Sequence, residues 1–135
     1  MKLSACVIVK NEEENIGTWL SSMKKIADEM IVVDTGSTDR TVEMAKAAGA
    51  RVFHHAWQND FAAAKNCALE KAKGDWILFL DADEYFSPQT IAKVRPLLME
   101  VEKSTKPIVG VICRLVNIDK DQGNRFTGAI FQLRI

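Results

Sequence analysis

The chain contains 135 residues, of which 47% are hydrophobic and 7% aromatic, and its 18 basic side chains balance its 18 acidic ones. A chain of this length is about one domain and can bury a core without disulfides or a structural metal. The zero net charge argues against a nucleic-acid-coating protein, because no overall positive field would attract a polyanion.

The first elements are a strand over residues 3–9 and a helix that follows it. The strand is almost uninterruptedly apolar, which is typical of a strand buried on both faces. Asn11 is expected to cap the helix, with Glu14 as its capping-box partner. The apolar residues at helical spacing are Ile16, Trp19, Leu20, Met23 and Ile26.

The next elements are a strand over 30–33, a helix through Ala48 and a strand over 50–55. The first of these strands ends at Asp34, and the turn after it offers Ser37 or Thr38 as a helix cap. Gly49 stands where a left-handed residue ends a helix.

Asp60 is expected to cap a helix over 61–73, and a strand over 76–80 follows that helix. Ser87-Pro88 predicts another helix start, and Pro96 should interrupt or kink that helix. Strands over 108–116 and 126–135, separated by a polar turn, predict an antiparallel pair.

This order predicts an α/β fold of the Rossmann-like type: a mostly parallel sheet flanked by helices, with an antiparallel addition near the C-terminus. We expect residues 1–135 to form a single domain. Because the chain stops inside an apparent strand, we also expect that it is a truncated part of a longer protein. The sheet would then have an exposed edge, through which a homodimer can form.

Carboxylates gather where the predicted strands end, which is where open α/β sheets bind ligands. Glu12 and Asp34 follow the first two strands, and Asp81 and Asp83 follow the fourth. Two carboxylates 4 Å apart repel by about 4 kcal/mol at an effective dielectric constant near 20. A divalent cation reverses the sign of that interaction, and Mg²⁺ or Mn²⁺ bridging a diphosphate suits such oxygen ligands. The alternative is a solvated loop that leads to the Ser87 cap.

Other polar residues allow two interpretations each. Asp34 can bind a uracil imide or a ribose hydroxyl, or it can initiate a turn. Lys65 can offset the carboxylates or contact a phosphate, or it can lie on a solvated helix face. His54 and His55 are not accompanied by residues that would suggest a partner for them. Trp57 is expected in the core.

Two well-known nucleotide-binding motifs are absent from the sequence, namely GxGxxG and GxxxxGK[ST]. Three scattered cysteines without a CxxC pair indicate a reducing cytoplasm rather than a disulfide framework. The parent protein is therefore expected in the cytoplasm, with a peripheral location at the inner membrane face as one option.

Four segments, taken in order, resemble the motifs of family 2 glycosyltransferases. They are Ile8 to Ile16, Ile31 to Thr41, Phe61 to Asn66, and Gly74 to Glu84. The resemblance implies a GT-A fold, a nucleotide-diphospho-sugar donor, and inverting transfer assisted by Mg²⁺ or Mn²⁺. The residues of these motifs are most similar to those of bacterial members that modify lipopolysaccharide core or peptides, or that carry helical repeats downstream.

The resemblance also assigns roles to single residues. It implies that Glu12 and Asp34 hold the nucleoside, that Asp81 contacts the ribose and supports the metal, and that Asp83 ligates the metal. Lys65 matches a position usually held by Arg near the nucleotide. The donor implied is a UDP-sugar, and the acceptor, whether glycan, lipopolysaccharide core or peptide, stays open.

The chain departs from the family pattern in two places. Ile8-Val9-Lys10 stands where many members have Pro-Thr-Tyr, so an aromatic that stacks on the base is missing there. No residue resembles the general base that inverting transfer needs, so this group is expected beyond residue 135 and the isolated chain should transfer sugar weakly or not at all. Asp119 and Asp121 are expected to be turn residues.

Two other functions are compatible with the same residues. One is a non-catalytic nucleotide-binding or scaffold module of the same fold. The other is a phosphatase of the DxD type, although its motif would follow the first strand and would contain Thr or Val where this chain has Tyr85.

Overall fold

The computed structural model describes residues 1–108, 110–119 and 125–134, with side chains as far as Val111. The chain divides into two compact units, residues 1–103 and residues 104–135, and each is described by itself. No helix in the described part of the chain combines the length and apolarity needed to cross a bilayer.

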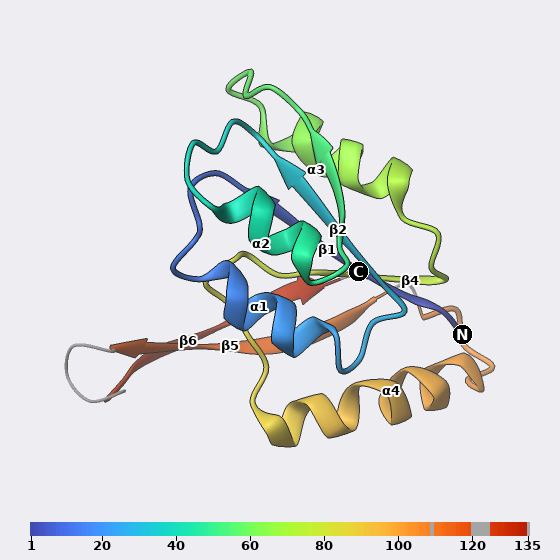
Figure 1. Ribbon diagram of the computed structural model, residues 1–135. Coiled ribbons are helices and arrows are strands. Elements are labelled where there is room, and N and C mark those ends of the chain that lie inside the picture. The colour runs from blue at the N-terminus through green and yellow to red at the C-terminus, as the bar shows by residue number, and fades with distance from the viewer. Residues whose placement is uncertain (109, 120–124, 135) are drawn as a thin grey trace. The chain divides into compact units, whose positions relative to one another are not determined.

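The first unit is built on a four-stranded parallel sheet with the strand order β3-β2-β1-β4 (Figure 1). This order confirms the predicted α/β class. The elements of this unit are β1 Leu3–Val9, α1 Ile16–Met23, β2 Glu29–Asp34, α2 Thr41–Ala47, β3 Arg51–His54, α3 Phe61–Lys71, β4 Trp76–Phe79 and α4 Pro88–Glu102.

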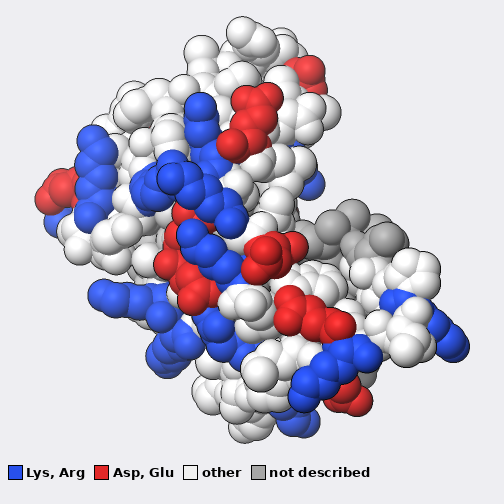
Figure 2. All heavy atoms as spheres, turned by 90° about the vertical axis from the view of Figure 1, so that its right-hand side faces the viewer, with Lys and Arg blue, Asp and Glu red and all other residues white. Residues whose placement is uncertain are grey.

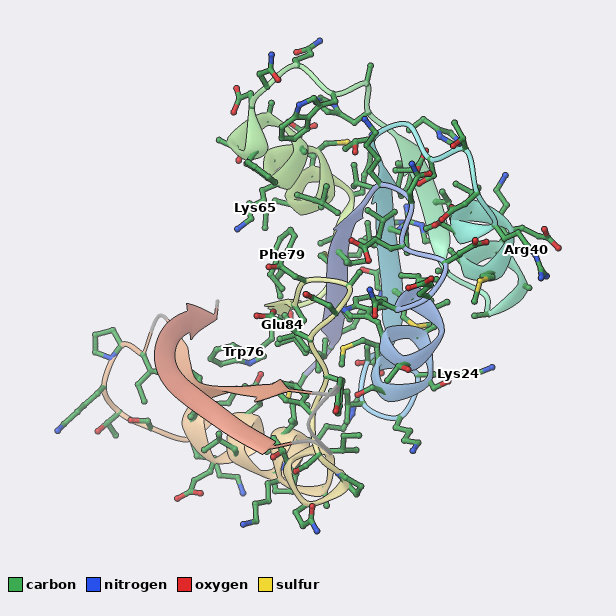
Figure 3. The ribbon with its side chains drawn as sticks, turned by 90° about the vertical axis from the view of Figure 1, so that its left-hand side faces the viewer. Lys24, Arg40, Lys65, Trp76, Phe79 and Glu84 are labelled. Carbon is green, nitrogen blue, oxygen red and sulfur yellow. The ribbon has the colours of Figure 1, made fainter. Side chains whose placement is uncertain are left out.

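Helices cover both faces of this sheet. α1 and α2 lie against one face and α3 lies against the other (Figures 1 and 3). On the α3 face, Ala68 packs with the strand residues Cys6, Ile31 and Val33 in a buried cluster. The side chains predicted to form the apolar stripe of the first helix are all buried, and Trp19 is completely inaccessible. The alternation of side chains along the strands therefore supplies two cores, one on each face.

Several predicted helix ends are confirmed. Asp60 accepts a hydrogen bond from the Ala63 amide, and Ser87 accepts one from the Thr90 amide, so both residues cap their helices. Gly49 has a φ of 85° and follows α2 as expected.

Other predicted ends are wrong. Asn11 does not cap α1, whose N-cap is Asn15, and α2 begins after Arg40 rather than after Ser37 or Thr38. The side chains of Asn11 and Ser37 instead bind the backbone of each other's loop. Pro96 does not interrupt α4, which runs continuously from Pro88 to Glu102, and the alternative of a kink at Pro96 stays a prediction.

The amino ends of the strands are joined by a compact polar cluster. Glu29 accepts hydrogen bonds from the Ser4 hydroxyl and the Lys73 amide, and it pairs with Arg51. Burial pushes the pKa of Glu29 up, but these bonds outweigh burial and hold the pKa below its usual value. A Cβ on Gly74 would lie 2.7 Å from the Ser4 backbone nitrogen, so this position requires glycine.

The side of the molecule that faces the viewer in Figure 2 carries basic and acidic side chains next to one another rather than in separate patches. The ion pairs of the described residues include Arg51–Glu29 and Arg95–Asp28, with N–O distances of 3.0 and 2.7 Å. Basic and acidic side chains are therefore equal in number in the sequence and also interspersed on this side of the molecule.

The second unit is an antiparallel hairpin of β5 Val111–Asp119 and β6 Arg125–Arg134. The predicted antiparallel pairing is therefore present, within a two-stranded sheet of its own. Asp119 is the last residue of β5, and Asp121 lies outside the described residues. The addition of the hairpin to the parallel sheet, and a homodimer through a sheet edge, stay predictions.

Candidate functional site

The strand order gives the sheet a point at which the direction of the chain across the sheet reverses. The chain runs from β1 outward to β2 and β3, and then crosses back to place β4 on the other side of β1. The switch point of the topology therefore lies between β1 and β4, and ligands of open α/β sheets bind at the carboxyl ends of the strands at such a point. The candidate carboxylates follow these strands and β2.

The register brings three strand ends to the same level. Val9 in β1 is the partner of Asp34 in β2, and Asp34 is the partner of His54 in β3. The loops that follow β1 and β2 therefore start side by side, which allows their side chains to meet.

Hydrogen bonds join the loops after β1 and β2 into one structure. The Asn11 amide donates to the Ser37 hydroxyl over 2.9 Å, and the Thr38 amide donates to Asn11 Oδ1 over 2.7 Å. Asn11 has a φ of 54°, a conformation that Asn tolerates better than most residues. The residue that looked like a helix cap in the sequence thus couples the two loops.

Glu12 is held inside this structure. Its amide donates to the Thr41 hydroxyl over 2.8 Å, and its carboxylate accepts a hydrogen bond from the Asn15 side chain over 3.0 Å. Its carbonyl oxygen accepts from the amides that begin α1. Glu12 is half-buried, so its backbone is fixed while part of its side chain stays accessible.

Asp39 closes the second loop. Its carboxylate accepts hydrogen bonds from the hydroxyl and amide of Thr41 and from the Glu13 amide. Desolvation pushes the pKa of Asp39 up, but these hydrogen bonds outweigh it, so the pKa lies below its usual value. A carboxylate that accepts several N–H and O–H bonds is stabilised in its charged form.

Asp34 is a buried carboxylate, with 4% of its side chain exposed. It accepts hydrogen bonds from the Gly36 amide over 3.3 Å and the Ser37 amide over 3.1 Å, which is the geometry of a turn initiated by Asp. Gly36 has a φ of 122°, which an L side chain rarely adopts. The turn interpretation of Asp34 is therefore present in the structure, and a role in ligand binding would be added to it.

His54 is the residue at this edge that sequence reasoning missed. Its Nδ1 lies 3.3 Å from Asp34 Oδ2, while 66% of its side chain is exposed. Nothing near His54 in the sequence indicates this partner. The available signal was that Asp34 and His54 both stand at the ends of strands that were expected to be neighbours in the sheet.

Asp81 and Asp83 differ from the carboxylates just described. Both are exposed, in a turn closed by a hydrogen bond from the Glu84 amide to the Asp81 carbonyl over 2.9 Å. The Glu84 carboxylate in turn accepts a hydrogen bond from the Asp81 amide over 2.8 Å. Among the residues whose side chains the structure describes, none is recorded as donating a hydrogen bond to either Asp carboxylate, and both residues are exposed.

These two carboxylates fit a hard divalent cation. Within the described ranges, no three His, Cys, Asp or Glu side chains are arranged to hold a metal by themselves. Mg²⁺ ordinarily binds proteins through one or two carboxylates and completes its shell with water and substrate phosphates. Asp81 and Asp83 match this requirement in number and in chemistry.

Lys65 projects from α3 toward β4. Its ammonium lies 5.7 Å from the centre of the Phe79 ring, in a cation–π arrangement. Figure 3 labels Lys65, Phe79 and Glu84, which come from α3, β4 and the loop after β4. The structure therefore brings Lys65 to the strand that carries the carboxylate turn, although no ion pair of the described residues joins Lys65 to Asp81 or Asp83.

Trp57 is placed differently from the sequence expectation. It was expected in the core, but it is 37% exposed, and the adjacent Phe61 ring is 68% exposed. Both lie just after β3, at the carboxyl edge of the sheet.

Comparison with known proteins agrees with this geometry. The family model for glycosyl transferase family 2 matches residues 4–131. A TPR repeat-containing protein of Synechococcus elongatus is 46% identical over 101 residues, which cover 75% of this chain and 25% of that protein. An uncharacterized glycosyltransferase of Rickettsia bellii is 46% identical over 88 residues, or 65% of this chain and 30% of that protein. The chain thus spans about a quarter to a third of the curated relatives it matches.

A solved structure has the same fold with ligands present. It is glucosyl-3-phosphoglycerate synthase from Mycobacterium tuberculosis in complex with Mn²⁺, UDP and glucosyl-3-phosphoglycerate, which is 25% identical, with a TM-score of 0.61. The match covers 77% of this chain and 40% of that chain. The motifs, the parallel sheet with its acidic carboxyl edge and the family match agree: this chain is a GT-A-type domain that belongs to glycosyl transferase family 2.

Proposed function

We propose that this chain binds the nucleotide part of a UDP-sugar donor through a divalent ion, as the donor-binding part of an inverting glycosyltransferase. The observation that carries the proposal is a difference among the carboxylates at the carboxyl edge of the sheet. Asp34 and Asp39 are already engaged by backbone amides, whereas Asp81 and Asp83 follow β4 with accessible carboxylates. The family match supports the proposal, as does the neighbour solved with Mn²⁺ and UDP.

Each candidate residue then has a distinct task. Asp83 and Asp81 would hold Mg²⁺ or Mn²⁺, and the ion would neutralise charge that develops on the leaving diphosphate. Glu12 and Asp34 would bind the nucleoside from a preformed pair of loops, so little ordering entropy is lost on binding. Lys65 would place a positive charge beside the diphosphate, on the β4 side of the site.

The proposal concerns donor binding. The acceptor side of the reaction, including the general base, is assigned to no residue of this chain. Weak or absent sugar transfer by the isolated chain belongs to the same proposal.

Calorimetric titration with UDP tests it. The wild type should bind UDP more tightly with Mn²⁺ or Mg²⁺ than with EDTA, and Asp83→Ala should remove this difference because one of two carboxylate ligands is lost. Glu70→Gln is the matched control: it removes one exposed negative charge from α3 and should leave the metal dependence intact. Metal-dependent UDP binding of unchanged strength in Asp83→Ala would contradict the assignment.

A further inference from the structure

Two exposed aromatic rings lie together at the carboxyl edge of the sheet. The Trp57 and Phe61 ring centroids are 4.7 Å apart, with an interplanar angle of 73°, an edge-to-face pair. Exposed aromatic rings lose the free energy that burial would provide, and these two rings are 37% and 68% exposed. Exposed apolar side chains that lie in contact with each other, unlike scattered single ones, are a candidate binding surface.

The loop that carries the pair is held by its own contacts. Trp57 Nε1 donates to Asn59 Oδ1 over 3.0 Å, and Asn59 has a φ of 56°. Asp60 then caps α3 through the Ala63 amide over 3.1 Å, which fixes the position of Phe61 in the first turn of the helix. The rings are therefore oriented before any ligand binds, which lowers the entropic cost of stacking.

The order of groups along the carboxyl edge of the sheet matches the order of base and phosphates in a nucleoside diphosphate. The pair follows β3, whose last residue His54 contacts Asp34, whereas the accessible carboxylates Asp81 and Asp83 follow β4 at the opposite side of the sheet. The edge thus offers an uncharged aromatic end and a metal-binding end, with Asp34 between them. A nucleoside diphosphate has a flat uncharged base at one end and its negative charges at the other.

The loops nearest to Asp34 contain no competing ring. Residues 10–15 after β1 and residues 35–40 after β2 are all non-aromatic. Tyr85 is also exposed, but it follows the carboxylate turn and so belongs to the diphosphate end.

We propose that Trp57 and Phe61 form a stacking platform for the nucleobase of the donor. This inference rests on the proposed donor-binding function. Stacking explains why two large apolar rings are left exposed at this edge, and it supplies the base contact that the loop after β1 cannot make. Because every base has a π face, the platform contributes affinity for the base without selecting a sugar.

The test compares a ligand with a base and a ligand without one. Calorimetric titration in Mg²⁺ with UDP and with inorganic pyrophosphate would be run on the wild type, Trp57→Ala and Phe61→Ala. Each variant should bind UDP about tenfold more weakly, because stacking on one ring is lost. Pyrophosphate affinity should change less than twofold.

Leu69→Ala is the matched control, since Leu69 lies on α3 two turns beyond Phe61 and is 42% exposed. It should bind both ligands like the wild type. Trp57→Phe and Phe61→Tyr keep a ring at each position and should restore most of the UDP affinity. Thermal unfolding of each variant verifies that it is folded.

The outcomes separate this inference from the proposed function. Wild-type UDP affinity in both alanine variants, or an equal loss of UDP and pyrophosphate affinity, would overturn the platform while leaving donor binding in place. A wild type that binds neither ligand in Mg²⁺ would overturn the donor-binding function and this inference with it.

Discussion

The loops after β1 and β2 and the turn after β4 are both acidic, but their carboxylates are in different states. In the first region Asp34 and Asp39 accept hydrogen bonds from backbone amides and hold the loops together. In the second region Asp81 and Asp83 are exposed, and no donor among the described residues contacts their carboxylates. Acidic residues at a strand end can therefore build the site or remain available to a ligand, and the sequence motif alone does not distinguish the two.

The difference has a physical cause in the order and register of the strands. The loops after β1 and β2 are neighbours in the sheet, so their polar groups can satisfy one another, as Asn11 and Thr38 do. β4 is an edge strand, and its last residue Phe79 pairs with Cys6, three residues before β1 ends at Val9, so the turn after β4 starts at a different level from the loops after β1 and β2. Its two aspartates consequently stay exposed.

The largest effect on stability is expected for Asp34→Ala. Removing this buried carboxylate leaves the amides of Gly36 and Ser37 without their acceptor, which should lower the free energy of unfolding by about 1–2 kcal/mol. Urea denaturation would measure the loss, with Asp34→Asn as the control that keeps one acceptor oxygen and should lose less. If Asp34→Ala were as stable as the wild type, the distinction between the two regions would not hold.

A smaller effect is expected from pH through Asp39. Its pKa is lower in the folded protein than its ordinary value of 3.8, so the folded state binds fewer protons and is stabilised above that value. This contribution is lost as the pH falls through the folded pKa, below about pH 4. Urea denaturation would be measured at several pH values between 2.5 and 6. The free energy of unfolding should change less with pH for Asp39→Asn than for the wild type.

Asp83→Asn is the comparison variant for that experiment, because it removes a carboxylate that no described donor contacts. An equal loss of acid dependence in both variants would assign the effect to general charge rather than to the hydrogen bonds of Asp39.

The smallest effect on stability is expected for the double variant Asp81→Asn, Asp83→Asn. Without metal, its unfolding free energy should lie within about 0.5 kcal/mol of the wild type, because the substitutions touch no packed group and remove a like-charge pair. With millimolar Mn²⁺ and UDP, the melting temperature of the wild type should rise while that of the variant should not. A destabilised metal-free variant would indicate that the turn is structural, like the loops after β1 and β2.

The sequence by itself determined the α/β class, the four parallel strands, the buried stripe of α1, and the helix caps at Asp60 and Ser87. These features depend on apolar periodicity and local capping, which a short stretch of chain encodes completely. The motifs also located the carboxylates at strand ends.

Only the tertiary structure decided what each of those polar groups contacts. Asn11 binds the loop after β2 instead of capping α1, and His54 of β3 contacts Asp34 of the neighbouring strand β2. Trp57 is partly exposed rather than buried in the core. Each of these outcomes depends on which strand ends become neighbours, and that is set by strand order and register rather than by local sequence. Patterns along the chain therefore specified the elements, while contacts between distant segments determined which residues form the site.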